Sequence, residues 1–121
     1  MNMSGIKMIE SDTPYILLEN VLEKVHAAMA EDVSHQTSLF KSLSDPIRLH
    51  ILKALEVQEL CVCVLVELTD YKYSALSYHL KLLKDVNLVD SRRDGSFQTY
   101  FLTDFGNSIL KSINESFEKE D

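Results

Sequence analysis

A small, mainly α (α+β) fold is predicted by three features of this 121-residue sequence. Apolar residues recur at helical spacing along most of the chain, and only the stretch after Asn87 changes to a period of two. The chain contains 3 glycines and 2 prolines, which favours regular elements over loops. Its length fits one domain, for which about 100–200 residues is usual.

The N-terminal part predicts an arm followed by two helices. Residues 1–12 show no periodicity and are expected to form a flexible arm. Thr13-Pro14 is typical of a helix start, and this first helix should run to about residue 30. Its apolar stripe is Leu18, Leu22, Val25 and Met29. A second helix is expected from about Asp32, with Val33, Phe40 and Leu43 as its apolar residues.

The middle of the chain predicts three further helices and a turn. Asp45-Pro46 is the clearest start signal, and Ile47, Ile51 and Leu55 form the stripe that follows. A short helix is expected from about Leu60 to Leu68, and a turn over residues 70–73. The next helix begins at Ser74, and its expected buried residues are Leu76, Leu80, Leu83 and Val86.

The C-terminal part predicts a hairpin and a last helix. Residues 89–93 and 97–102 alternate in polarity around Asp94-Gly95-Ser96, and Asp-Gly between two such runs favours a β-hairpin. Thr103 can cap a final helix with the stripe Ile109, Ile113 and Phe117. Short helix, turn, helix and hairpin is the order of a winged helix-turn-helix, here with five to six helices and a two-stranded wing. We expect one domain over residues 13–121, in which the terminal helices form a homodimer interface.

The charge distribution points to double-stranded DNA as a partner. The formal net charge is −7, yet residues 72–93 contain five basic and two acidic side chains, which leaves +3 there and −10 elsewhere. Ser74, Ser77, Tyr78 and His79 lie near the start of the helix and are predicted to read base edges. The predicted phosphate contacts are Lys72, Lys81, Lys84, Arg92 and Arg93. The alternative is an ordinary amphipathic helix with a solvated polar face.

Two cysteines, Cys61 and Cys63, are candidates for a metal site or a redox pair. Residues two apart in a regular helix lie about 200° apart, but an extended backbone ahead of the first turn lets both sulfurs converge. Thiolates select soft or borderline ions such as Zn(II), Cd(II), Pb(II), Cu(I) or As(III). A tetrahedral ion needs two more ligands, for which Glu10, Asp12, His26, His35 or a second subunit are the candidates. The alternatives are two small buried side chains or a reversible dithiol, and a structural disulfide is not expected.

Other classes of protein are less compatible with the sequence. No apolar run approaches the roughly 20 residues of a membrane span, and no signal peptide is recognisable, so a cytoplasmic protein without a membrane partner is expected. Neither Ser77 nor His79 has an acidic orienting residue or an oxyanion element nearby in sequence, so we expect no enzyme and no organic cofactor. A winged-helix protein-interaction module and a metal-buffering protein remain alternatives.

Three segments together resemble the ArsR/SmtB family of metal-sensing repressors. They are residues 43–52 (LSDPIRLHIL), 59–63 (ELCVC) and 74–80 (SALSYHL). The resemblance covers about residues 33–103. It implies a homodimeric winged-helix repressor that leaves its operator when an inducer ion binds, with metal loading and DNA binding reciprocally coupled.

The sequence departs from the family pattern at the ligand positions. The residue after Cys63 is Val64 where the family often has an aspartate, and Glu67 stands where some members have a further cysteine. The family's second site on the last helix is not matched, since Phe105 follows Asp104 and no histidine occurs after His79. Only Cys61 and Cys63 carry over, so a redox-responsive or effector-independent regulator is the competing hypothesis.

Overall fold

The computed structural model describes residues 6–8 and 16–118 of the chain. It consists of two compact units, Met1–Val33 and Ser34–Asp121. The boundary at Val33 differs from the boundary at residue 12 that the sequence predicts. Each unit is described by itself.

The first unit contains a short antiparallel strand pair and a helix. Strands β1 (Ile6–Met8) and β2 (Ile16–Leu18) pair in the register Ile6↔Leu18. Helix α1 (Glu19–Met29) follows directly. The prediction of a helix from residue 13 is therefore wrong at its start, because residues 16–18 pair with β1 instead; Thr13-Pro14 lies outside the described residues. Residues 6–8 of the expected arm form β1.

The second unit begins with two helices that the sequence predicts well. Helix α2 is Ser34–Leu43 and helix α3 is Pro46–Val57. Asp45 caps α3, since its Oδ1 accepts hydrogen bonds from the backbone N–H of Ile47 at 2.8 Å and of Arg48 at 3.4 Å. Partial desolvation favours the protonated form of Asp45, but these two bonds and the Arg48 charge outweigh it and hold its pKa below 3.8.

The helix-turn-helix comes next, preceded by a strand that the sequence analysis missed. Strand β3 (Leu60–Cys61) leads into α4 (Val62–Leu68), and α5 (Tyr73–Asp85) follows the turn. Two residues of extended backbone carry no periodicity, so the sequence could not distinguish β3 from the start of the helix. The strand is defined by its partner, since it pairs with the wing.

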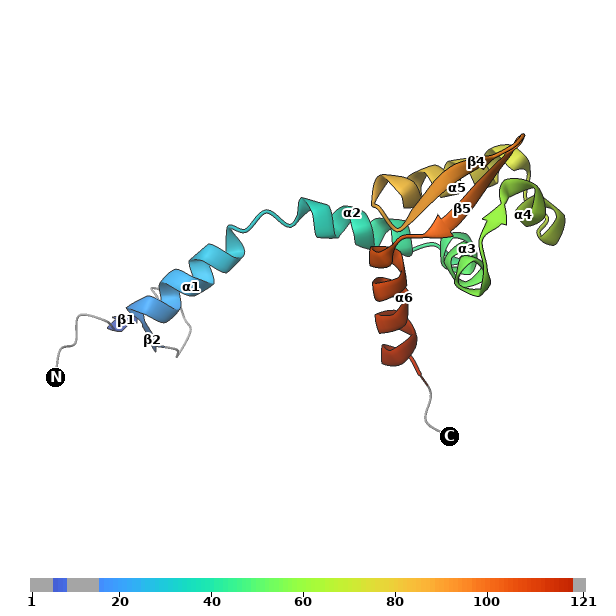
Figure 1. Ribbon diagram of the computed structural model, residues 1–121. Helices are drawn as coiled ribbons and strands as arrows, with labels where there is room; N and C mark the ends of the chain where they lie inside the picture. The colour runs from blue at the N-terminus through green and yellow to red at the C-terminus, as the bar shows by residue number, and fades with distance from the viewer. Residues whose placement is uncertain (1–5, 9–15, 119–121) are drawn as a thin grey trace. The chain divides into compact units, whose positions relative to one another are not determined.

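The wing is a hairpin that β3 extends to a three-stranded antiparallel sheet. Strands β4 (Val89–Asp94) and β5 (Phe97–Leu102) pair in the register Asp94↔Phe97, and the sheet order is β3-β5-β4. Gly95 has a φ of 63°, as the first central residue of a two-residue hairpin turn requires. The prediction of a two-stranded wing is corrected to three strands. Figure 1 shows the long hairpin in orange, with β3 in green beside it.

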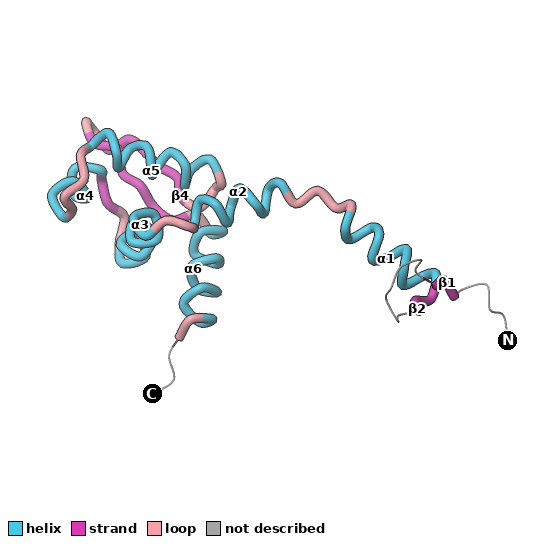
Figure 2. Tube along the Cα trace, turned by 180° about the vertical axis from the view of Figure 1, so that it is seen from behind, coloured by secondary structure: helices cyan, strands magenta, loops and turns pink. Residues whose placement is uncertain are grey.

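The last helix, α6 (Asp104–Ser116), is capped as predicted by Thr103, whose Oγ1 accepts from the backbone N–H of Gly106 at 2.9 Å. Helix α3 lies between α4 and α6, and α5 runs alongside the sheet (Figure 2). The core contains the residues expected for α5, namely Leu76, Leu80, Leu83 and Val86, which are at most 8% exposed. Of the helices that the structure describes, none is long and apolar enough to cross a membrane.

Candidate nucleic-acid interface

Helix α5 presents a polar face because its apolar face is completely buried. Leu76, Leu80 and Leu83 are 0% exposed, so the side chains between them face away from the core. Of the predicted base-reading residues, Ser74 and Tyr78 are exposed, and Ser77 and His79 are half-buried. The Tyr78 and His79 rings contact each other edge to face, with centroids 5.6 Å apart. All four lie in the first turns of α5, with Ser74 and Tyr78 on its exposed side and the half-buried Ser77 and His79 on opposite flanks of that side.

The basic side chains around α5 divide into paired and unpaired ones. Lys81 forms an ion pair with Asp85 at 3.2 Å, and Lys84 Nζ lies 3.7 Å from Asp90 and donates to the Ser91 hydroxyl at 3.1 Å. Among the described residues, no hydrogen bond or ion pair involves the side chain of Lys72. The local positive charge is thus partly neutralised by carboxylates of the same surface.

The two arginines of the wing also differ, since Arg92 has ionic partners and Arg93 has none among the described residues. Arg92 forms an ion pair with Glu59 at 2.5 Å and with Asp94 at 3.2 Å, and its guanidinium lies 5.7 Å from the centroid of the Phe101 ring. The hydrogen bond from Arg92 holds the pKa of Glu59 below 4.5, and the two carboxylates raise the pKa of Arg92 in return. Arg92 therefore ties β4 to the residue before β3. Arg93 is exposed and makes no side-chain hydrogen bond or ion pair within the described part of the chain.

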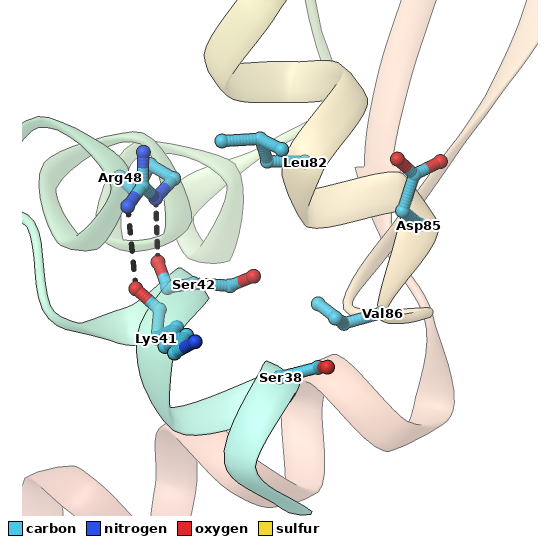
Figure 3. A pocket seen from close by; sticks show the side chains of 7 residues that line it. All are labelled: Ser38, Lys41, Ser42, Arg48, Leu82, Asp85 and Val86. Atoms are coloured by element: carbon cyan, nitrogen blue, oxygen red, sulfur yellow. Dashed lines mark hydrogen bonds between the residues drawn. The ribbon is translucent and has the colours of Figure 1, made fainter. Parts of the chain in front are cut away.

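A pocket of about 300 Å³ lies beside the C-terminal half of α5. Figure 3 shows its lining from α2, α3 and α5, with the Arg48 guanidinium donating to the backbone carbonyls of Lys41 and Ser42. Asp85 faces this pocket from α5. Arg48 thus joins the α2–α3 corner to the helix that carries the polar face.

The two cysteines are joined by a disulfide bond. This corrects the expectation that no disulfide forms between residues two apart. Cys61 ends strand β3 with extended backbone (φ −83°, ψ 159°), and Cys63 lies in the first turn of α4, so their Cα atoms are only 5.4 Å apart. That separation is within the ordinary range for a disulfide. The extended backbone ahead of α4 thus lets the two sulfurs meet, as the sequence analysis expected.

The cysteines also line a pocket between the wing and α5. It has a volume of about 90 Å³, and its other lining residues are Val62, Tyr73, Ser96, Phe97 and Gln98. Cys61 pairs with Thr99 of β5, and Tyr73 is the first residue of α5. The cysteine pair therefore shares a pocket with residues of the wing and with the first residue of α5.

The structure describes two of the further metal ligands that the sequence suggests, His26 and His35. Glu10 and Asp12 lie outside the described residues, His26 lies on α1 of the first unit, and His35 lies on α2. Within residues 6–8 and 16–118, no three His, Cys, Asp or Glu side chains lie close enough together to hold a metal ion. The cysteines are the two donors that this part of the chain supplies.

Two residues that order this surface, Arg48 and Glu59, had no role in the sequence analysis. Both stand inside the segments that resemble the family, Arg48 after Asp45-Pro46 and Glu59 just before Cys61. Their partners, His79 and Arg92, are 31 and 33 residues away in sequence. No local pattern predicts such pairs.

A helix-turn-helix over α4 and α5, followed by a paired wing, defines a winged helix-turn-helix protein. Residues 45–91 match the arsR family of bacterial regulatory proteins. The "Transcriptional repressor SmtB homolog" of Synechocystis sp. is 38% identical over 105 residues, which are 86% of this chain and 78% of that protein. The chain belongs to the ArsR/SmtB family of transcriptional regulators.

Two further relatives show the range of the family. The "Cadmium resistance transcriptional regulatory protein CadC" of Listeria innocua is 34% identical over 103 residues, 81% of this chain and 87% of that protein. The solved structure titled "Reduced HlyU from Vibrio cholerae N16961" is similar with a TM-score of 0.65 at 26% identity. It covers 77% of this chain and 99% of the other.

Proposed function

We propose that this chain is a transcriptional repressor that binds operator DNA as a homodimer and loses operator affinity when Cys61 and Cys63 bind a soft metal ion. The observation that carries the proposal is the position of the two sulfurs, between β5 of the wing and Tyr73 at the start of α5. A change at the sulfurs alters the backbone that holds both DNA-contacting elements. Because such coupling is reciprocal, DNA must also weaken ion binding by the same factor.

The donor chemistry fits a thiophilic ion. Two converging thiolates select soft or borderline metals, and an ion bound there would hold the sulfurs apart in fixed geometry and bring in further donors. Those donors would come from Glu10, Asp12, His26, His35 or the second subunit. The similarity to CadC, a cadmium resistance transcriptional regulatory protein, supports a metal as effector.

An exposed apolar groove supports the homodimer. It lies between α2 and α6, has a volume of about 230 Å³, and is bordered by Phe40 and Phe117, which are 64% and 80% exposed. The described residues of α1 contribute no buried side chain, and Met29 there is 83% exposed. Large apolar surfaces of this kind mark association sites, and a second copy of the chain supplies a matching one.

Oxidation of the same pair is the second candidate function, favoured by the disulfide itself. In this version the oxidised and reduced forms of Cys61 and Cys63 differ in operator affinity, with no ion required. The similarity to a structure described as reduced HlyU supports this alternative.

Fluorescence anisotropy with the upstream promoter fragment of the gene separates these possibilities. The reduced protein should form a salt-dependent complex that Cd(II), Pb(II) or Zn(II) dissociates, with thiolate charge-transfer absorbance rising in parallel. The matched control is the Cys61→Ser/Cys63→Ser variant, which should bind DNA and ignore the ions. Ion-induced release that survives in this variant overturns the metal assignment. Release by peroxide alone supports the redox version, and a protein without any salt-dependent complex is an interaction module instead.

A further inference from the structure

We propose that Arg48 of α3 is a positioning residue for DNA readout, which fixes the tautomer and orientation of His79 so that its Nε2–H is offered as a hydrogen-bond donor to a base edge. This inference rests on the proposed DNA-binding function. Arg48 itself lies on another helix and is not one of the predicted DNA contacts.

The Arg48 guanidinium is held rigidly on three sides. Its Nε donates to the Ser42 carbonyl at 2.6 Å, its Nη2 donates to the Lys41 carbonyl at 3.3 Å, and its Nη1 lies 3.8 Å from Asp45 Oδ2. The side chain is only 12% exposed. A planar guanidinium with this many partners has one orientation available to it.

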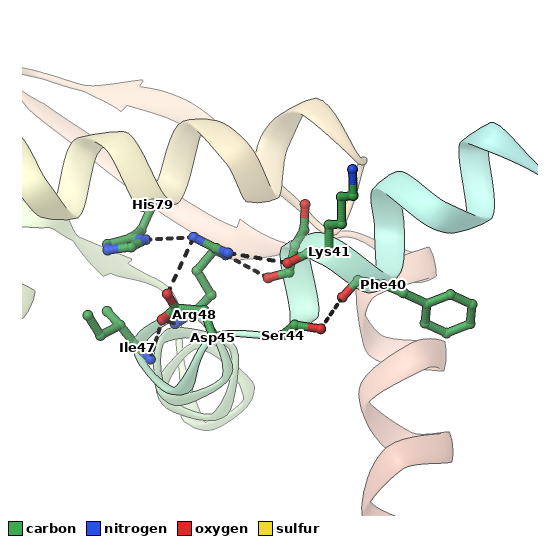
Figure 4. Close-up of polar contacts among 8 residues, drawn as sticks. Phe40, Lys41, Ser44, Asp45, Ile47, Arg48 and His79 are labelled. Atoms are coloured by element: carbon green, nitrogen blue, oxygen red, sulfur yellow. Dashed lines mark hydrogen bonds and ion pairs between the residues drawn. The ribbon is translucent and has the colours of Figure 1, made fainter.

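The remaining contact of this group reaches the polar face of α5. Arg48 Nη1 lies 3.0 Å from His79 Nδ1, as Figure 4 shows together with the bonds to the α2–α3 corner. The contact bridges two helices, α3 and α5, whose residues are 31 positions apart. It fixes where the imidazole points, because the arginine cannot follow a rotated ring.

The chemistry of arginine decides which nitrogen of the neutral ring carries the hydrogen. A guanidinium has only donors and stays protonated, so Nδ1 must be the acceptor in this bond. In the neutral ring the hydrogen then sits on Nε2, which points away from Arg48 (Figure 4). Without Arg48 either nitrogen could carry the hydrogen, and His79 could present a donor or an acceptor.

A fixed Nε2–H donor on His79 favours some bases over others. In the major groove a donor can pair with N7 or O6 of guanine, N7 of adenine or O4 of thymine, but not with the N4 amino group of cytosine. Ser74, Ser77 and Tyr78 carry hydroxyls, which both donate and accept and so discriminate less. His79 is thus the member of the predicted base-reading set whose polarity is set by the fold.

Selection from a random-sequence duplex library tests the inference without a known operator. The proteins compared are the wild type, Arg48→Met, His79→Ala and the double variant. The matched control is Lys53→Met, which removes one positive charge from the same helix and, within residues 6–8 and 16–118, breaks only the 3.0 Å bond to Asn114. Thermal unfolding confirms that each variant is folded at the selection temperature.

We expect Arg48→Met and His79→Ala to lose preference at the same base positions, by roughly fivefold each, the lower part of the range for a base-edge contact. The double variant should lose no more than His79→Ala alone. Lys53→Met should select the wild-type sequence. Nitrogen-15 spectra of the imidazole should show the Nε2–H tautomer in the wild type and a mixture in Arg48→Met.

Three results count against the inference. A wild-type sequence preference that persists in Arg48→Met, or a uniform loss at every position, would mean that Arg48 acts only on folding. An Nδ1–H tautomer in the wild type would contradict the geometry directly. A wild-type protein that selects no sequence overturns the DNA-binding proposal itself, which is a different failure.

Discussion

The salt dependence of DNA binding follows from the division of the basic residues into paired and unpaired ones. Each phosphate that a protein neutralises contributes about −0.9 to the slope of log K against log salt. Lys72 and Arg93 are the predicted phosphate contacts whose side chains have no ionic partner in the described part of the chain, whereas Lys81, Lys84 and Arg92 each have a carboxylate within 4 Å. A paired lysine brings its carboxylate to the phosphate, which cancels much of the attraction.

The magnitude can be worked out for a dimer. Two unpaired cations per protomer give four phosphate contacts, a slope of about −3.6 and a loss of about 150-fold in affinity between 50 and 200 mM salt. Five contacts per protomer would give a slope of about −9 and a loss of more than about 10⁵-fold over the same range. The two cases differ far beyond the error of an anisotropy titration.

Substitutions sharpen this test. Lys72→Ala or Arg93→Ala should each flatten the slope by about 1.8, since each removes two contacts from the dimer. Lys81→Ala should change it little. Asp85→Asn releases Lys81 from its 3.2 Å ion pair and should steepen the slope by a similar amount. A wild-type slope near −9, with Lys81→Ala as damaging as Lys72→Ala, would refute the reasoning that these ion pairs persist in the complex.

Three further predictions concern stability. Gly106→Ala should destabilise the protein by about 3 kcal/mol in urea unfolding, because a Cβ there would lie 2.0 Å from the backbone oxygen of Leu88; an unchanged midpoint would show that α6 shifts freely. Asp45→Ala should lower Tm by about 4–8 °C through loss of the α3 cap, with Asp45→Asn as the capping control; equal losses would indicate a purely electrostatic role. The hydrogen bond from Arg92 lowers the pKa of Glu59, so the stabilising effect of Glu59 is present above pH 4.5 and is lost as the pH falls through the folded-state pKa. The difference in unfolding free energy between wild type and Glu59→Gln should therefore shrink over that acid range, and a constant difference would contradict the ion pair.

Elements whose signals are local were predicted from the sequence. The α3 cap at Asp45, the Asp-Gly hairpin and the Thr103 cap each depend on two or three adjacent residues, and each forms as expected. The buried face of α5 follows from leucine spacing alone. Elements that need a distant partner were missed, since β3 exists only through its pairing with β5, and the start of α1 is displaced because residues 16–18 pair with β1.

At the candidate site, too, features with a local signal were predicted and features that need a distant partner were missed. The residue types on α5 and at the cysteines were evident from the sequence, but their ionic partners were not. Lys81 and Lys84 have carboxylates within a few positions, whereas Arg92 finds Glu59 and His79 finds Arg48 across more than 30 residues. A count of charges over residues 72–93 gives +3 and includes neither Glu59 nor Asp94. The sequence therefore overstates how much of this positive charge is available to a phosphate.

These contacts also suggest how the cysteine pair and the polar face of α5 could be coupled. Glu59 lies two residues before Cys61, on the segment that continues into β3, and its ion pair with Arg92 joins that segment to β4. If ion binding or reduction displaces Cys61, as the proposed function requires, we expect the wing to move with it or the Arg92–Glu59 pair to break. Under the proposed function, we expect either outcome to lower operator affinity. Glu59→Gln removes one charge of the pair and should reduce the ion- or redox-induced loss of affinity while leaving the cysteines intact. An undiminished response in this variant would mean that the signal passes through Tyr73 and α5 instead.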